Sequence, residues 1–555
     1  ERRSTVTSER DQLALTAAEG LTVLRSSQQA LRDSLVVQGH GAIEVLAEGL
    51  HATGNRGFTA LQGRAHADPA ATATPGPVVR FIRLGPLAQD GSHRYRVLRN
   101  DTATRGRGSP RAVRNRDRGN RDLELTGSGS CTIRLRERVV EQLLLASPLQ
   151  DIKVVMHGTA NRLEELGSVV AVYDPEHGTG SWTGKGSRVH ATFETRRGTV
   201  HGFAEEIHQP TADTLRLVGE RAEVRHPDYG VLRGREIRLR RFGAAARSLD
   251  EDVELSAWQD AKLLVDHTDA DSGERTKSIL QADELHIEPF AVPPGVARVH
   301  QGWMPTGLDL WLDGRYLLAR GNVLLDIEHH RGTEVTHGHG TGNRLVLRTD
   351  RAGRAFADGF LSGEPARFRS RGARGQPMAA AATTIRCFLR AEQQYLVLVD
   401  SPRFQPQLIL DGSLGGHQSD VRTVMTCAGD IEVLPRRIAY HGPVQVRTVD
   451  HNGGEQRDGT RFDAAQLEMR RGPDGQVNYI ACRDRVRFRW GEVHGTCDEL
   501  VLDAQHTRLM ARGVDKPAVI QLPDRQITVR QVNYNYRTRM AQCWQGSAKD
   551  LLTAR

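Results

Sequence analysis

The sequence is poor in the residue types that build large globular cores. Hydrophobic residues make up 38% of its 555 residues and aromatic residues 5%, whereas apolar residues with glycine are about 45–50% of typical domains. No run approaches the roughly 18 apolar residues of a membrane-spanning helix, and "YLVLV" at 395–399 is typical of the longest. With 56 glycines and apolar residues that alternate, the composition favours an elongated structure one or two β-layers thick.

Common catalytic and metal-binding signatures are also missing. The sequence has no GxSxG and no HExxH, and its six cysteines form no CxxC, so the spacings of serine hydrolases, zinc proteases and zinc ribbons are excluded. The glycine-rich stretches at 178–184 and 338–342 do not lie between a buried strand and a helix, as a phosphate-binding loop would. We therefore predict no enzyme activity and no cofactor. The sequence leaves undecided whether Cys482 and Cys497 form a disulfide, because this depends on an oxidising compartment.

One histidine-rich segment, "EHHRGTEVTHGHG" at 328–340, could bind a metal ion. His337 and His339 would share one face of a strand, with Glu334 nearby. Solvated histidines are the commoner explanation of such a turn, so we predict no metal site.

The net charge of +8 comes almost entirely from arginine, because the chain has only six lysines. The densest basic segment, "RGRGSPRAVRNRDRGNRD" at 105–122, contains no aromatic residue to stack on nucleic-acid bases. It is typical of a linker or insertion, and we predict no nucleic-acid partner.

Units of strand, polar turn and strand recur along the chain. The segments 462–489, 495–522 and 524–546 align on Ala481, Ala511 and Ala541, thirty residues apart, and their apolar residues alternate as in half-buried strands. The segment 8–35 also reads as two strands, "QLALTA" and "GLTVLRS". A glycine often interrupts a strand, which is typical of a bulge or sharp bend. We predict strand corners at such glycines: Gly63, Gly219, Gly321, Gly363, Gly442 and Gly513.

The stretch from "LLARGNVLLDI" to "FLSGEPARFR" resembles the repeat of the lipopolysaccharide-transport family, which comprises periplasmic bridge and organic-solvent-tolerance (OstA-like) proteins. The resemblance rests on three motifs that recur in order. They are Ala319, Gly321, Asn322 and Val323; Asn343, Leu345 and Leu347; and Gly363, Pro365, Ala366 and Phe368. A second copy is formed by Asp498, Leu500 and Leu502 with Ala511, Gly513, Pro517 and Ala518.

The resemblance implies a β-jelly-roll folded like a taco, whose groove holds the acyl chains of lipopolysaccharide or another envelope glycolipid. It also implies a periplasmic location and partners of the same fold, joined through terminal edge strands. Because the chain starts at Glu1, an N-terminal signal or anchor is expected to be missing. The strand-corner motif would comprise Gly321, Asn322, Gly363, Pro365, Gly513 and Pro517.

Period-two alternation selects the candidate residues of the groove, although a closed, dry core would give the same pattern. The lipid-groove candidates are Leu345, Leu347, Leu467, Met469, Leu500, Leu502, Val532 and Tyr534. Arginines at the rim could bind headgroup phosphates, although a solvated face is the commoner explanation. These headgroup candidates are Arg485, Arg487 and Arg489.

The predicted fold is an all-β, solenoid-like stack of antiparallel strands in tandem modules. We expect β-modules at 1–104, 123–300, 301–425 and 426–555, with 105–122 as the linker. The predicted function is a lipid-binding bridge or accessory protein in glycolipid export. Two alternatives are a parallel β-helix enzyme that acts on acidic polysaccharide and a structural or adhesive surface solenoid.

Overall fold

The structure, a computed structural model, is built of β-strands. It describes residues 4–8, 13–25, 35–47, 50–56, 58–64, 78–84, 94–99, 123–136, 139–156, 161–174, 179–195, 198–211, 214–227, 230–241, 253–268, 273–288, 316–349, 356–371, 377–390, 393–412, 414, 420–450, 452–454, 456, 459–472 and 476–544. These residues contain forty strands and no helix, and the strand pairings with a described register are antiparallel. The predicted all-β stack of antiparallel strands is confirmed.

The chain divides into an N-terminal unit, Glu1–Ala261, and a C-terminal unit, Lys262–Arg555. The division falls within β20 (Val253–Thr268). The predicted module boundaries stay predictions, but the ladder runs from β21 to β22 and from β25 to β27 and β28 without a break. The predicted linker at 105–122 lies outside the described residues.

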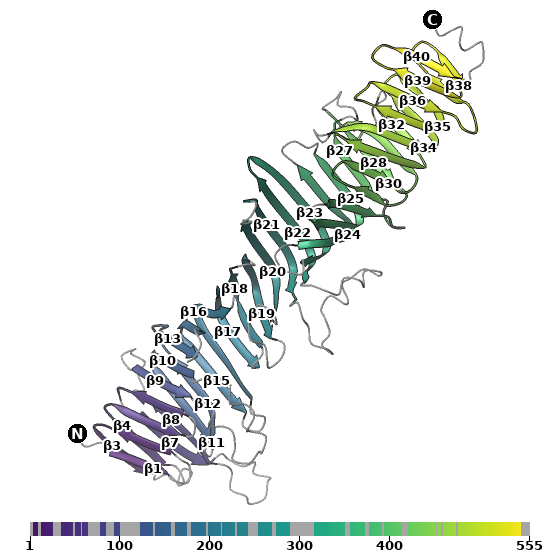
Figure 1. Cartoon of the computed structure of the whole chain (residues 1–555). Helices are drawn as coiled ribbons and strands as arrows, with labels where there is room; N and C mark the ends of the chain where they lie inside the picture. Colours follow the sequence, from purple (N-terminus) through teal and green to yellow (C-terminus); the bar gives the residue numbers. More distant parts are fainter. Residues whose placement is uncertain are drawn as a thin grey trace, which may run out of the picture. The chain divides into compact units, whose positions relative to one another are not determined.

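Two ladders form the N-terminal unit, and the chain alternates between them (Figure 1, purple to blue). Wall A is the ladder β1 (Ser4–Ser8), β2 (Leu13–Ala17), β5 (Ile43–Ala47), β6 (Leu50–Gly54), β9 (Arg94–Arg99), β10 (Leu123–Ser128), β13 (Ile152–Met156) and β14 (Arg162–Leu166). Wall B is the ladder β3 (Gly20–Arg25), β4 (Leu35–His40), β7 (Phe58–Arg64), β8 (Val78–Leu84), β11 (Ser130–Arg136), β12 (Val139–Ala146) and β15 (Ser168–Asp174). Strands β2 and β3 confirm the prediction of two strands within 8–35.

The two walls join on long strands. In β16 (Thr179–Thr195), the first half pairs with β15 of wall B and the second half with β14 of wall A. The long strands β17 (Gly198–Thr211), β18 (Thr214–His226) and β19 (Gly230–Arg241) continue the ladder, and each carries part of both walls.

The C-terminal unit has the same plan. It begins with the long strands β21 (Arg275–Ile287), β22 (Tyr316–Arg331), β23 (Glu334–Thr349), β24 (Phe356–Arg371) and β25 (Met378–Arg390), drawn in teal and green in Figure 1. The two halves of β25 then pair with different strands: the second half with β26 (Gln393–Val399) and the first with β27 (Gln407–Asp411). Two separate ladders start at this point.

Wall C contains β26, β29 (Ile431–Val433), β30 (Arg437–Tyr440), β33 (Gln466–Arg471), β36 (Arg508–Arg512), β39 (Gln531–Asn535) and β40 (Met540–Trp544). Wall D contains β27, β28 (Val421–Cys427), β31 (Val444–Asp450), β32 (Arg461–Ala464), β37 (Ala518–Gln521) and β38 (Gln526–Val529). Two long strands, β34 (Val477–Trp490) and β35 (Val493–Asp503), run from one wall to the other. In the same way, one half of each strand β21–β25 belongs to wall C and the other half to wall D.

A corner separates the two walls in each long strand. The register shifts between Arg320 and Val323 in β22, where Gly321 and Asn322 have φ of 73° and 47°. Similar shifts occur at 341–344 in β23 and at 362–366 in β24. Gly363 and Pro365 lie in the last of these, so the three motifs of the family resemblance mark three neighbouring corners.

Glycine is not required at every corner. The corner of β34 is made by Asp484 and Arg485, with φ of 62° and 54°. Gly513 lies between β36 and β37, where the chain passes from wall C to wall D, and Pro517 ends the same connection. The prediction of a corner at Gly63 is wrong, because this glycine pairs with Val79 inside the regular ladder of β7 and β8.

Candidate functional site

The eight predicted groove residues lie on one face of wall C, in two continuous rows. In the first row each residue lies opposite the next one on the neighbouring strand. The row comprises Leu345, Leu361, Ile385, Leu398, Ile431, Tyr440, Leu467, Cys482, Leu500, Ala511 and Val532. The second row runs beside it, from Leu347 through Met469 and Leu502 to Tyr534. All eight side chains are at most 8% exposed. The structure therefore brings the predicted set together along this wall.

Wall D presents a matching apolar face. One row of cross-strand neighbours comprises Leu408, Met425, Val446, Phe462 and Phe488, followed by Gly495, Ile520 and Ile527. A Cβ atom added to Gly340 of wall D would lie 3.3 Å from Leu361 of wall C. The two apolar faces are thus the inside of the fold, and the two walls close over them.

The interior is closely packed where both walls consist of short strands. Tyr440 of wall C donates a hydrogen bond to the Sδ atom of Met425 in wall D over 2.7 Å. Phe462 is fully buried and contacts Trp490, with ring centroids 6.0 Å apart. Burial raises the pKa of the Tyr440 hydroxyl well above its ordinary value. Leu467, Met469, Leu500 and Leu502 belong to this closed part, so they are core residues in this structure.

The inner face of wall D is less completely buried among the long strands β22–β25. Leu325, Ile327, Phe368 and Met378 all point inward from wall D, because they share cross-strand rows with Gly340, Gly338 and Ala380. Each of the four is only partly buried. The residues beside them are small, and Phe368 lies over Gly338 and Gly340. These half-buried apolar side chains beside glycine and alanine are a candidate surface for an apolar ligand.

The three headgroup candidates do not line this interior. Arg487 and Arg489 alternate with the buried Val486 and Phe488, so they point outward from wall D. Arg485 lies at the corner itself. Arg485 therefore does not share a strand face with Arg487 and Arg489, and headgroup binding by the three arginines stays a prediction.

Three histidines of 328–340, His330, His337 and His339, lie on the outer face of wall D, whereas His329 has the strand parity of the inward-pointing Ile327. His337 and His339 share that face, as predicted, and Nδ1 of His339 is hydrogen-bonded to Oδ1 of Asp326 at 2.6 Å. Across the described ranges of the chain, no three histidine, cysteine, aspartate or glutamate side chains form a group that could hold a metal ion.

The six cysteines are free. Cys482 lies on the inner face of wall C opposite Leu500, and Cys497 lies in β35 opposite Val486. Burial raises the pKa of Cys482 well above its ordinary value and that of Cys497 to about 12. Both thiols therefore behave as small apolar groups.

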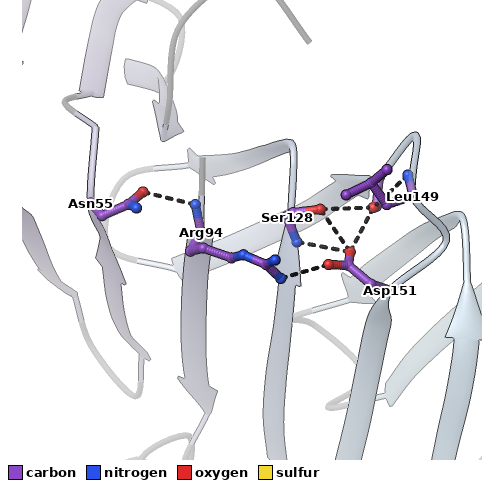
Figure 2. Close-up of polar contacts among 6 residues, drawn as sticks. Asn55, Arg94, Ser128, Leu149 and Asp151 are labelled. Carbon is purple, nitrogen blue, oxygen red and sulfur yellow. Dashed lines mark hydrogen bonds and ion pairs between the residues drawn. The ribbon is translucent and has the colours of Figure 1, made fainter. Parts of the chain in front are cut away.

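Acidic residues hold the corners together, a role that the sequence analysis missed. In the N-terminal unit, Asp151 accepts hydrogen bonds from the backbone and hydroxyl of Ser128 at 3.0 and 2.8 Å, and from the hydroxyl of Ser147 at 2.7 Å (Figure 2). Arg94 completes the cluster with an ion pair of 2.7 Å. Burial alone would raise the pKa of Asp151, but these hydrogen bonds and the Arg94 charge outweigh it and lower the pKa.

The C-terminal unit uses the same arrangement. Asp498, the first residue of the second copy of the family motif, accepts hydrogen bonds from the backbone amides of Val514 and Asp515, the latter at 2.9 Å. These bonds lower the pKa of Asp498. Asp283 similarly accepts hydrogen bonds from Asn322 at 3.0 and 3.3 Å. In the sequence, turn-forming residues such as "SPLQD" at 147–151 could have indicated these corner contacts.

Replacing Asp151 by alanine is expected to destabilise the N-terminal unit by about 2 kcal/mol at pH 7, because it leaves several donors without their charged acceptor. Since its folded pKa is lowered, the contribution of Asp151 is present above the unfolded pKa of about 3.9 and is lost as the pH falls below it. Urea unfolding of the wild type and the variant between pH 7 and 3 should show their difference shrinking. The control Asp524→Ala, whose side chain is 62% exposed, should change little. A difference for Asp151→Ala that is independent of pH would contradict the argument.

None of the comparisons with family models, curated proteins and solved structures gives a match. Function must therefore be inferred from the arrangement of the walls. In the ranges that the structure describes, no helix has the length and apolar content needed to cross a membrane.

Proposed function

We propose that this protein binds the acyl chains of an amphiphile, lipopolysaccharide or another envelope glycolipid, between walls C and D. The proposal places it in the periplasm as a bridge or accessory protein of glycolipid export, without catalytic activity. It is supported by the motif resemblance and by the antiparallel two-walled fold.

The partly buried inner face of β22–β25 carries the proposal. Leu325, Ile327, Phe368 and Met378 are apolar, point inward and remain accessible. A hydrocarbon chain that covers them would gain about 0.8 kcal/mol for each buried methylene. The closed part of the interior, with its contact between Tyr440 and Met425, offers no such space.

The terminal strands support the proposed bridging. In the N-terminal unit β1 and β3, and in the C-terminal unit β38 and β40, each have one hydrogen-bonded neighbour among the described strands. Their unpaired edges offer backbone donors and acceptors that a partner strand can extend. On β40, Met540 and Trp544 are 66% and 44% exposed, which adds apolar surface for a partner of the same fold.

The parallel β-helix alternative is wrong as a fold, because the described registers are antiparallel. The adhesive surface solenoid remains a candidate of the same architecture, and the two proposals differ in whether lipid is bound. Bound lipid therefore decides between them.

Photo-crosslinking at two positions of β22 tests lipid binding. Ile327 points inward and Leu324 outward, and both side chains are half-buried. A photoreactive residue at 327 should label the acyl chain of an added glycolipid, measured by mass spectrometry of the linked peptide. The same residue at 324 should not.

The phosphate-free detergent dodecyl maltoside supplies a second readout. It should compete with the label at 327, because only its hydrocarbon chain is needed for binding. Equal labelling at 324 and 327, or no labelling of a correctly folded protein, would refute the proposal.

A further inference from the structure

The outer face of wall D carries a groove whose lining also includes Ile327 and Met378 of the inner rows. It encloses about 510 Å³ across β21–β25, β27 and the start of β28. Outward-pointing side chains dominate its lining, because they belong to two cross-strand rows that alternate with the inner ones. One row contains Ile279, Asp326, His339, Arg369, Ala379 and Ile409, and the other Lys277, Glu328, His337 and Arg371.

Four basic side chains form a rectangle in the groove. Register places His337 opposite Arg371 and His339 opposite Arg369. Neighbouring strands are about 4.8 Å apart, and residues two apart on one strand are separated by about 6.6 Å. The four side chains, which we call the basic quartet, can therefore converge on one tetrahedral anion.

The acidic residues of the groove already have partners, whereas the arginines of the quartet do not. Asp326 is bonded to His339 at 2.6 Å, Glu328 lies 3.8 Å from Lys277, and Asp411 lies 3.5 Å from Arg422. Arg369 and Arg371 are exposed and form no ion pair within the described part of the chain. Two guanidinium groups in a concave site are suited to bidentate binding of a phosphate.

The two flanks of the quartet differ in chemistry. On one side, Asp326 and Glu328 present carboxylates, which accept hydrogen bonds from hydroxyl groups. On the other side, Ala379 and Ile409 form an apolar ledge. A phosphate with an attached sugar matches this order. The anion would bind the quartet, the sugar hydroxyls would donate hydrogen bonds to the carboxylates, and the apolar face of the sugar would pack on Ala379 and Ile409.

We infer that this groove binds a phosphorylated sugar through His337, His339, Arg369 and Arg371. Among its described lining residues the groove has no phenylalanine, tyrosine or tryptophan, so it lacks the large aromatic side chains on which nucleic-acid bases stack. The inference does not rest on acyl-chain binding, because the quartet points away from the inner face of wall D, although Ile327 and Met378 also line the groove. The sugar phosphate could be a free metabolite or the headgroup of a glycolipid.

Isothermal titration of the full chain with glucose 1-phosphate tests the inference. We expect saturable binding, weaker binding of inorganic phosphate, and none of glucose. In the double variant Arg369→Gln, Arg371→Gln the affinity should fall roughly 100-fold, because two charge-assisted contacts are lost. The matched control is Arg447→Gln, Arg461→Gln, a pair of exposed arginines on the same outer face and outside the groove. It should bind as the wild type does.

A glycolipid that carries one sugar phosphate, presented in micelles, separates the two sources. Binding that depends on Arg369 and Arg371 identifies the headgroup as a ligand, and binding of glucose 1-phosphate alone identifies the free metabolite. No binding of glucose 1-phosphate by the wild type, or an equal loss in the control pair, would overturn the inference. Neither result depends on acyl-chain labelling at Ile327.

Discussion

Replacing Phe462 by alanine is expected to lower the free energy of unfolding of the C-terminal unit by about 3–5 kcal/mol, the usual cost of a large cavity in a packed core. Phe462 is fully buried on the inner face of wall D and contacts Trp490. Its cross-strand neighbours Val446 and Phe488 are also buried, so little around the site can move into the space. Urea unfolding with peptide-resolved hydrogen exchange would measure the loss and locate it.

Phe368→Ala is the matched control. It removes the same side chain from the inner face of the same wall, at a position that is only partly buried. We expect a loss of about 1–2 kcal/mol, because less apolar area leaves water on folding there. Acyl-chain labelling at Ile327 should weaken in Phe368→Ala and persist in a Phe462→Ala protein kept below its unfolding transition. Equal losses of stability would show that the interior is a uniform core and would contradict an open groove.

The second large effect is expected at the corner between β36 and β37. A Cβ atom on Gly513 would lie 2.0 Å from the carbonyl oxygen of Lys516 and 2.6 Å from the amide nitrogen of Ala518. Both are backbone atoms, so the corner itself must move. Gly513→Ala should therefore destabilise the C-terminal unit by about 3 kcal/mol, at the upper end of the usual cost of overpacking.

Movement of this corner also disturbs its hydrogen bonds. The amide of Gly513 donates to Arg530 at 2.8 Å, and the next two amides donate to Asp498. Hydrogen exchange of residues 513–518 should therefore accelerate in the variant. Gly332→Ala is the control: it lies in a turn with φ of 60° and no atom within 4 Å, so only backbone strain of about 1 kcal/mol is expected. Equal losses of stability in the two variants would contradict the argument that the corner at Gly513 is crowded.

The strands could be predicted because alternation requires no knowledge of the partner strand. Leu345 and Leu347, or Leu500 and Leu502, are two residues apart, and strand geometry alone puts each pair on one face. The corners at Gly321 and Gly363 were also visible, because glycine within an alternating strand breaks the pattern. The corner at Asp484 and Arg485 was not visible, since aspartate favours a left-handed backbone far less than glycine does and arginine does not favour it at all.

The thirty-residue alignment shows where the pattern fails. Ala481 pairs with Val501 on the outer face, whereas Ala511 pairs with Leu500 on the inner face. Equal spacing in the sequence therefore does not place these alanines on the same face of the wall. A one-residue change at a bulge reverses which face a side chain occupies, and the bulges differ from strand to strand.

The headgroup candidates show a similar limit of the sequence pattern. Arg485, Arg487 and Arg489 alternate correctly in sequence, but alternation cannot tell the inside of a folded strand from its outside. The basic quartet could not be identified from the sequence. Its residues come from two strands, and only the pairing of β23 with β24 places His337 and His339 beside Arg371 and Arg369.

The sequence by itself determined that this chain is all-β, where many of its strands run and which residues share a face, because these properties follow from the two-residue period of one strand. Only the tertiary structure decided which strands pair, which face lies inside, and where the inner face is fully or only partly buried. Those properties depend on the register between strands and on the contacts between walls C and D, such as that of Tyr440 with Met425. Such contacts join residues that no local pattern relates.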